Sequence, residues 1–183
     1  MSENELKLSV RQAEEADYAF LLEMDHGYST EYVWQMELDA AHPGMGANFR
    51  EARLPRRMTV SYPRAKDAMA SEWKQRARLL VAEEDSRLVG YTAVATDYAP
   101  GAAWLTDLVV AASQRRKGVG TRLVLAAQQW AGKQKLERLV LEMQSKNYPA
   151  IKLAQKLAFE FSGYNDRYYP NQDIALFFAK RLV

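Results

Sequence analysis

A short basic turn with two glycines, Arg115-Arg116-Lys117-Gly118-Val119-Gly120-Thr121, constrains the fold of this chain more than any other stretch. The apolar run at residues 105–110 comes before it and has the length of a buried strand. The run at residues 119–130 comes after it, and its apolar residues recur with the period of a helix. The turn is therefore predicted to join a strand directly to the start of a helix.

The charge of this turn disfavours a helix start unless an anion binds there. A helix N-terminus exposes unpaired N–H groups and the positive end of the helix dipole, so acidic residues are favoured in its first turn. Here three cations, Arg115, Arg116 and Lys117, crowd the position and no acidic residue follows them. Gly118 and Gly120 would let main-chain amides approach an anion closely. We interpret the turn as an anion site; the alternative is a solvated basic turn with flexible glycines.

The overall composition makes any such anion site local. The 183 residues suit one domain spanning residues 1–183, and the formal net charge of only +2 argues against a nucleic-acid partner. No run approaches the roughly 20 apolar residues of a membrane span, and residues 1–10 lack an apolar signal core. We expect a cytoplasmic protein without a nucleic-acid or membrane partner.

Cysteine and histidine usage narrows the chemistry. The sequence has no cysteine, which excludes disulfides, thiolate zinc sites and a cysteine nucleophile. The two histidines, His26 and His42, match no metal-binding spacing. No metal is expected.

Hydrophobic patterning predicts the elements that surround the turn. The predicted strands are residues 6–10, 79–83, 88–94, 104–110, 139–141, 159–161 and 174–178, and the predicted helices are residues 13–24, 65–77, 119–133 and 149–158. The second and third of these strands form an antiparallel hairpin, and a tyrosine-rich loop at residues 164–172 separates the last two. The strands on either side of the helix at 119–133 are expected to pair in parallel.

Residues 28–78 are the variable region of the predicted domain, where prolines and glycines interrupt every pattern. Two strands are predicted there, at residues 32–36 and 57–61, and they could pair with each other. Aromatic residues are dense in this region: Tyr28, Tyr32, Trp34, Phe49 and Tyr62. They could form a wall that faces a substrate, or pack an extra hairpin, which is the more common role of aromatics. Trp34 is our candidate for substrate contact.

Two common phosphate-binding motifs do not fit the turn. A Walker loop places its lysine directly after the second glycine, whereas Lys117 precedes Gly118 here. A dinucleotide-binding fingerprint needs a third glycine, which the turn lacks.

The order of elements and two motifs resemble the GNAT N-acetyltransferase superfamily. Arg115, Gly118 and Gly120 occupy the fixed positions of the family pattern Gln/Arg-x-x-Gly-x-Gly/Ala, and Asn147-Tyr148-Pro149-Ala150 is similar to its Asn-x-x-Ala segment. Leu141-Glu142-Met143-Gln144 followed by Asn147 is similar to streptothricin-type acetyltransferases. The resemblance implies an α+β fold: a mixed, mostly antiparallel central sheet with a central parallel strand pair, flanked by helices.

The resemblance also implies acetyl-CoA as co-substrate. The diphosphate would be bound by the basic side chains and the amides of the turn, contributed by Arg115, Arg116, Lys117, Gly118, Val119, Gly120 and Thr121. In the family the preceding strand splays from the next one and the pantetheine arm fills the gap. Main-chain groups of Leu108, Val109 and Val110 would then bind the arm, with an amide near Val109 polarising the acetyl carbonyl. Asn147 would contact the coenzyme; otherwise it only caps a helix.

Candidate catalytic residues are less clearly marked. Asp107, predicted on the same strand face as Leu105 and Val109, is the candidate base; alternatively it pairs with a structural arginine. Many family members have a tyrosine acid where Ala154 stands, so another tyrosine would have to replace it, or the thiolate would leave without an acid. Tyr164 is our candidate, with Tyr148, Tyr168 and Tyr169 as alternatives. The candidates for acceptor binding are Glu142, Gln144, Trp34 and Tyr168.

These observations predict an N-acetyltransferase in which a primary amine of a small molecule, such as an antibiotic or polyamine, or of a peptide attacks acetyl-CoA within a ternary complex. The alternative is a coenzyme-A-binding sensor or regulatory module that transfers nothing, because Ala154 stands at the usual tyrosine position. Aromatic residues near Tyr168 and Phe177 would permit a homodimer.

Overall fold

The computed structural model describes residues 8–38 and 46–182. The strands are β1 (Ser9–Gln12), β2 (Tyr28–Leu38), β3 (Ala47–Val60), β4 (Arg78–Glu84), β5 (Arg87–Ala95), β6 (Ala102–Val110), β7 (Arg138–Gln144), β8 (Glu160–Asn165) and β9 (Ala175–Arg181). The α-helices are α1 (Tyr18–Glu23), α2 (Lys66–Trp73), α3 (Val119–Lys133) and α4 (Tyr148–Lys156), and short 3₁₀ turns occupy Glu15–Asp17 and Ala112–Gln114.

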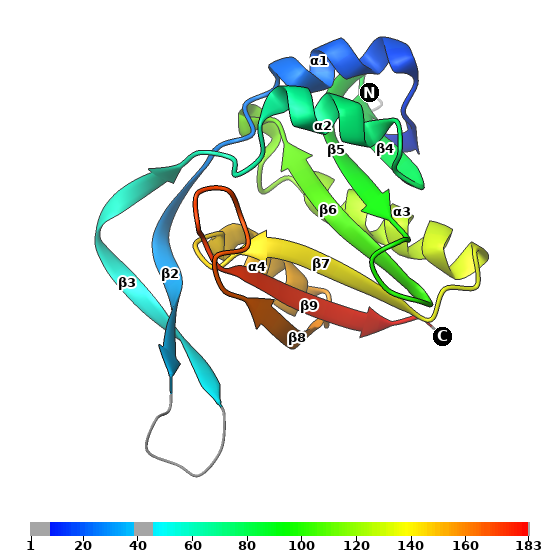
Figure 1. The fold of residues 1–183 in the computed structure, drawn as a ribbon. Helices are drawn as coiled ribbons and strands as arrows, with labels where there is room; N and C mark the ends of the chain where they lie inside the picture. Colours follow the sequence, from blue (N-terminus) through cyan, green and yellow to red (C-terminus); the bar gives the residue numbers. More distant parts are fainter. Residues whose placement is uncertain (1–7, 39–45, 183) are drawn as a thin grey trace, which may run out of the picture.

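Seven of the strands form one mixed sheet in the order β1-β4-β5-β6-β7-β9-β8. Five of its six strand pairs are antiparallel. The exception is the pair β6 and β7 at its centre, which run parallel and are connected in the sequence through α3. This confirms the predicted fold class (Figure 1). The β4–β5 hairpin and the bounds of α3 agree with the predictions, because hydrophobic periodicity is strong in these segments.

Helices cover both faces of this sheet and create two cores. On one face, α3 and α4 bury Leu123, Ala127 and Ile151 against β4 to β7 and β9. On the other face, Leu21 of α1 and Trp73 of α2 pack on the strands. The central strands are therefore buried on both sides, as parallel pairs usually are.

The strands β2 and β3 form a separate antiparallel ribbon, which stands beside the C-terminal half of the sheet (Figure 1). The ribbon is attached to the main domain by contacts near the end of β7 and the start of α4. The N–H of Trp34 donates to the carbonyl of Ser145 at 2.9 Å, and the rings of Tyr32 and Tyr148 stack with centroids 4.9 Å apart. Tyr32, Trp34 and Phe49 thus pack the ribbon against the main domain.

Several predicted bounds were wrong. The helix expected at 13–24 is a 3₁₀ turn followed by the short α1, and the strand expected at 6–10 is observed at Ser9–Gln12, with residues 6 and 7 outside the described part. Both strands expected in the 28–78 region are longer, because they pair mainly with each other rather than ending at the prolines. Residues 32–36 pair with 49–53, and 58–60 pair with 28–30, across a bulge. Tyr164 belongs to β8 and not to a loop.

No helix in the described ranges is both long enough and apolar enough to cross a membrane. Within the same ranges, no cluster of His, Asp or Glu side chains has the arrangement of a metal site.

The packing of β5 against β6 predicts a sensitive glycine. A Cβ atom at Gly90 would lie 2.7 Å from the carbonyl oxygen of Val109, a main-chain atom that cannot rotate away. We expect Gly90→Ala to lower the free energy of unfolding by about 1–3 kcal/mol, measured by urea denaturation, because overpacking forces the backbone to shift. Gly132→Ala is the control: Gly132 is exposed in α3, and a Cβ there would meet nothing within 4 Å. The control should gain about 1 kcal/mol of stability from helix propensity. An unchanged stability of Gly90→Ala would contradict the close strand contact.

Candidate active site

The main irregularity of the sheet is the point where β6 and β7 stop pairing. Their parallel ladder joins Ala102 to Arg138 and ends where Leu105 faces Leu141. Both strands continue beyond this point, to Val110 and Gln144, and diverge (Figure 1). A gap therefore opens between their C-terminal ends, as the family resemblance implied.

A β-bulge in β6 lies at the start of this gap. Asp107 pairs with Ala93 and Leu105 with Val94, so β6 has one more residue than β5 at this point. Consequently Leu105 packs in the core under α3 and α4, whereas Val109 packs in the core under α1 and α2. The prediction that Asp107 shares a face with both Leu105 and Val109 is therefore wrong, because a bulge reverses the alternation of side chains.

The same register decides which main-chain groups face the gap. The carbonyl of Asp107 accepts a hydrogen bond from Thr92 Oγ1 at 2.7 Å, and the N–H of Ala111 donates to Val89 at 2.9 Å, so both point toward β5. By strand alternation Val109 points the same way, and Leu108 and Val110 point toward the gap. Of the three predicted residues, Leu108 and Val110 are therefore positioned to offer main-chain groups to a ligand, and Val109 is not.

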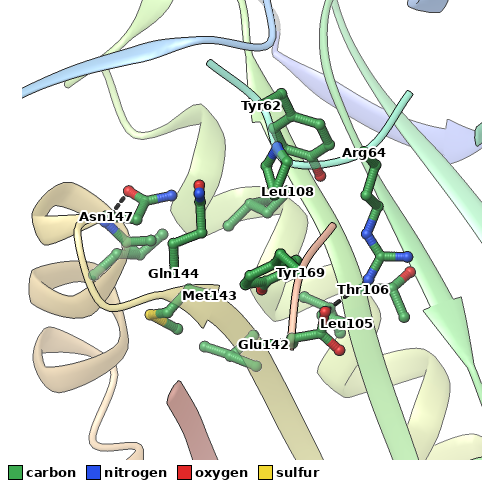
Figure 2. Close-up of a pocket in the computed structure, with 14 residues that line it drawn as sticks. Tyr62, Arg64, Leu105, Thr106, Leu108, Glu142, Met143, Gln144, Asn147 and Tyr169 are labelled. Carbon is green, nitrogen blue, oxygen red and sulfur yellow. Dashed lines mark hydrogen bonds and ion pairs between the residues drawn. The ribbon is translucent and has the colours of Figure 1, made fainter. Parts of the chain in front are cut away.

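A cavity, here called the gap cavity, occupies the space between the diverging strands (Figure 2). It is lined by Tyr62, Pro63, Arg64, Leu105, Thr106, Leu108, Leu141, Glu142, Met143, Gln144, Asn147, Ala150, Leu153 and Tyr169. Tyr62 and Arg64 reach it from the linker between β3 and α2, and Tyr169 from the segment between β8 and β9. Asn147 lies at its edge, where its side chain caps α4 by accepting the N–H of Ala150 at 3.2 Å.

The basic turn leads from β6 into α3 at the end of the gap. Gly118 is the N-cap residue with φ of 91°, a left-handed conformation that favours glycine, and the first helical bond runs from the N–H of Arg122 to its carbonyl at 3.0 Å. No side chain in the described part of the chain caps this helix. The amides of Val119, Gly120 and Thr121 are thus available to an anion, with Arg116 and Lys117 exposed beside them.

Arg115 has a different position from the other two cations. Its guanidinium donates to the carbonyls of Val110 at 3.0 Å, Gly27 at 2.8 Å and Asp25 at 3.1 Å. The side chain therefore ties the turn to the start of β2. Any direct bond to a diphosphate would have to displace these carbonyls, so we assign Arg115 the role of holding the turn in shape.

A buried charge cluster lies at the inner end of the gap cavity. Arg64 Nη2 donates to Glu142 Oε1 at 2.6 Å (Figure 2), and Arg64 Nε lies 3.8 Å from Asp107 Oδ1. Trp104 Nε1 and the hydroxyl of Tyr168 donate to Glu142 Oε2 at 3.1 and 3.0 Å. Burial raises the pKa of Glu142, and the Arg64 guanidinium opposes this shift.

The structure brings together Asp107, Glu142 and Tyr168 among the predicted residues, but it separates Tyr164 and Trp34 from them. Tyr164 lies on the outermost strand, β8, where its ring contacts Phe49 with centroids 5.2 Å apart. Trp34 packs edge-on against Phe178 at 6.3 Å. Neither side chain lines the gap cavity, so this geometry does not support their predicted roles as acid and substrate contact, which stay predictions.

Sequence reasoning missed Arg64 altogether, Tyr62 appeared in it only as one aromatic among several, and Tyr169 appeared only as one of three alternatives to Tyr164. The available signal for Arg64 was indirect: two carboxylates, Asp107 and Glu142, on adjacent central strands require a cation between them. Nothing in the sequence indicated that this cation comes from a proline-containing linker more than 40 residues earlier.

The turn geometry predicts which substitution blocks an anion there. A Cβ at Gly120 would lie 3.3 Å from Leu153 Cδ2, so a glutamate side chain would fill the space between α3 and α4 and place a negative charge at the open helix end. We expect Gly120→Glu to lose the rise in melting temperature that acetyl-CoA causes, with an unchanged circular dichroism spectrum. Gly132→Glu, at the exposed far end of the same helix, should keep the shift. An undiminished shift in Gly120→Glu would contradict this location of the site.

Comparison with known proteins agrees with this geometry. Residues 47–159 match the model of the acetyltransferase (GNAT) family. A nourseothricin acetyltransferase structure superposes with a TM-score of 0.82 at 22% identity, covering 96% of this chain and 99% of that one. A protein assigned as a streptothricin acetyltransferase from Bacillus anthracis str. Ames, solved in complex with acetyl coenzyme A, superposes with a TM-score of 0.76 at 20% identity, covering 98% and 100%.

A third structure, the ribosomal-protein-S18-alanine N-acetyltransferase from Escherichia coli, superposes with a TM-score of 0.67 at 16% identity, covering 96% of this chain and 94% of that one. No curated protein sequence matches significantly. At these identities the structures establish the fold, and the family model, which spans more than half of the chain, establishes the family. The chain is a member of the GNAT family of acetyl-CoA-dependent acetyltransferases.

Proposed function

We propose that this protein transfers the acetyl group of acetyl-CoA to a primary amine of a small molecule or peptide, by direct attack within a ternary complex. The observation that carries the proposal is that the gap cavity and the uncapped start of α3 are neighbours: Leu153 lines the cavity, and a Cβ at Gly120 would lie 3.3 Å from its Cδ2. One end offers free amides and cations to a diphosphate, and the other offers the main chain of Leu108 to an extended, amide-bearing arm. Acetyl-CoA has a diphosphate and such an arm in one molecule.

The gap positions the thioester for attack. With the arm alongside β6, the N–H of Leu108 faces the cavity and is the donor best placed to polarise the thioester carbonyl. This replaces the amide near Val109 that the resemblance had suggested, because Val109 faces β5. The chain has no cysteine, so an acetyl-cysteine intermediate is impossible, and direct attack of the amine on the thioester is the mechanism that we propose.

The leaving thiolate has a candidate proton donor in Tyr169. Ala154, at the position of the usual family tyrosine, is fully buried in the core and supplies no hydroxyl. Tyr169 lines the gap cavity, and burial together with the negative charge of Glu142 raises its pKa, so its hydroxyl stays protonated at neutral pH. We therefore assign Tyr169, and not Tyr164, as the acid. Asn147, Glu142 and Tyr168 then shape the cavity through the bonds described above.

The chemical class of the acceptor follows from the charge of the inner cavity wall. One guanidinium, Arg64, is shared beside this wall by three carboxylates, Glu142, Glu72 and the buried Asp107. This arrangement favours an acceptor that arrives as a cation, as a primary ammonium does at neutral pH. A small-molecule amine or the amine of a peptide satisfies this requirement.

An assay of coenzyme A release over a panel of alkyl amines, amine antibiotics, polyamines and peptides tests the proposal. We expect thiol release that depends on the acceptor, with the acetylated amine detected by mass spectrometry. In a thermal-shift comparison, acetyl-CoA should stabilise the protein more than NAD or ATP. Stabilisation by acetyl-CoA without any acetylated product would instead support the alternative, a coenzyme-A-binding regulatory module, which the buried Ala154 motivates.

A further inference from the structure

We propose that Tyr62 and Asp107 form a proton relay, in which the phenol of Tyr62 accepts a proton from the attacking amine and passes its own proton to Asp107. The proposal rests on the proposed acetyl transfer to an amine and names the base for that reaction. It makes Tyr62 a catalytic residue and gives Asp107, the predicted base, a route to the substrate.

The route is needed because Asp107 cannot touch a substrate. Its side chain is 1% exposed, and it does not line the gap cavity. Tyr62 does line the cavity, and its hydroxyl donates to Asp107 Oδ1 at 2.5 Å. The hydroxyl has one proton, which this bond occupies, so its oxygen can still accept a bond from a substrate N–H.

Tyr62 is reachable from two sides. It lines the gap cavity and also a second cavity between the end of α1, the start of β2 and the end of β3. Only Tyr62 and Arg64 line both. The phenol therefore stands between the gap cavity, which the proposed function assigns to the donor's arm, and the second cavity, from which an acceptor could approach.

Asp107, and not Glu142, the other carboxylate of the cluster, is the one that can take the proton of Tyr62, because the Tyr62 hydroxyl is bonded to Asp107 Oδ1. Both oxygens of Glu142 receive bonds, from Arg64 at 2.6 Å and from Trp104 and Tyr168 at 3.1 and 3.0 Å, and its side chain is 0% exposed. Asp107 lies 3.8 Å from Arg64, so the guanidinium neutralises it less. Its Oδ2 accepts only the hydroxyl of Thr106, at 3.1 Å.

The surroundings of Asp107 support this assignment. The titratable and charged groups that face it or its partners are Tyr62 and Arg64 from the linker, Tyr91 from β5, Glu142 from β7, Glu72 from α2 and His26 from the segment after α1. Burial lowers the pKa of His26 and raises that of Tyr91, so both are neutral at neutral pH, and their side chains are bonded to each other at 2.9 Å. Burial and the charge of Asp107 likewise raise the pKa of Tyr62, so the phenol conducts a proton and does not hold a negative charge.

The proposed step balances its protons as follows. A substrate ammonium gives one proton to the Tyr62 oxygen while the phenolic proton moves to Asp107, which leaves a neutral amine. The nitrogen lone pair forms the C–N bond as the carbonyl electrons move to oxygen, and collapse of this intermediate breaks the C–S bond. The second N–H proton neutralises the departing sulfur with the help of Tyr169. Asp107 returns its proton to solvent through Tyr62, so one proton is released per turnover.

The test compares Tyr62→Phe with the wild type on acceptor analogues whose amine pKa is varied, for example by β-fluorination. For an alkyl amine with a pKa of about 10.4 we expect kcat near neutral pH to fall about 100-fold or more, because the base has been removed. For amines with a pKa near about 8 the loss should be much smaller, since a far larger fraction of such an amine is already deprotonated in solution near neutral pH. Raising the pH should reduce the defect in the same way, and the KM for acetyl-CoA should stay within a factor of about two of wild type.

Tyr91→Phe is the matched control. Tyr91 is a buried tyrosine with a hydrogen-bonded hydroxyl that lines neither cavity, so losing that hydroxyl should not make the rate depend on amine pKa. Asp107→Asn should show the same dependence of the kcat loss on amine pKa as Tyr62→Phe, and the double variant should lose no more than either single variant. If Asp107→Asn does not fold, Tyr62→Phe alone decides the question. The relay would be overturned if Tyr62→Phe lowered kcat by the same factor for all amines. It would also be overturned if the variant kept the wild-type kcat for all of them. No turnover by the wild type with any amine would instead refute the proposed function.

Discussion

The loss of hydrogen bonding between β6 and β7 beyond Leu105 and Leu141 is the constraint on which the site depends. A buried N–H or C=O group without a partner costs about 1–3 kcal/mol, so strands at the centre of a sheet rarely separate. Here the separation leaves the main chain of Leu108 facing a cavity, where water or a ligand can satisfy it. The helix that connects the two strands begins at the same place. A single interruption of the sheet therefore creates a slot for an extended chain and places a positive helix end at its mouth.

Side chains hold the gap at its inner end, where the main chain no longer does. Arg64 lies between the diverged strands and joins Asp107 on β6 to Glu142 on β7. Breaking one partner from a buried ion pair costs about 3–5 kcal/mol, so this cluster is energetically significant. Arg64 comes from the linker that follows the β2–β3 ribbon, and it lines the gap cavity. The variable region of the chain therefore reaches the gap cavity through this side chain. The ribbon, which is attached to α4 and to the end of β7, in turn determines where that linker lies.

The parts of the fold that depend on local patterning were predictable, and the parts that depend on distant contacts were not. The periodicity of α3 and the apolar runs of β4 to β7 predicted the hairpin, the parallel pair and the turn that joins β6 to α3. The bulge in β6 has no marker in the sequence, and it moved Asp107 to the face opposite Leu105 and turned Val109 away from the gap. Trp34 and Tyr164 were misplaced because aromatic residues have the same composition signal whether they pack a ribbon or line a cavity. Arg64 and Tyr62 reach the site only through the long excursion of the ribbon.

The central claim is that the interrupted strand and the uncapped helix bind one molecule of acetyl-CoA. Amide hydrogen exchange followed by NMR, with and without acetyl-CoA, measures this directly. The amides of Leu108, Val119, Gly120 and Thr121 should all become protected on binding, whereas the amide of Val109, already within the β5–β6 ladder, should change little. The account would be contradicted if acetyl-CoA protected the three helix amides but not the amide of Leu108. It would also be contradicted if acetyl-CoA protected none of these amides.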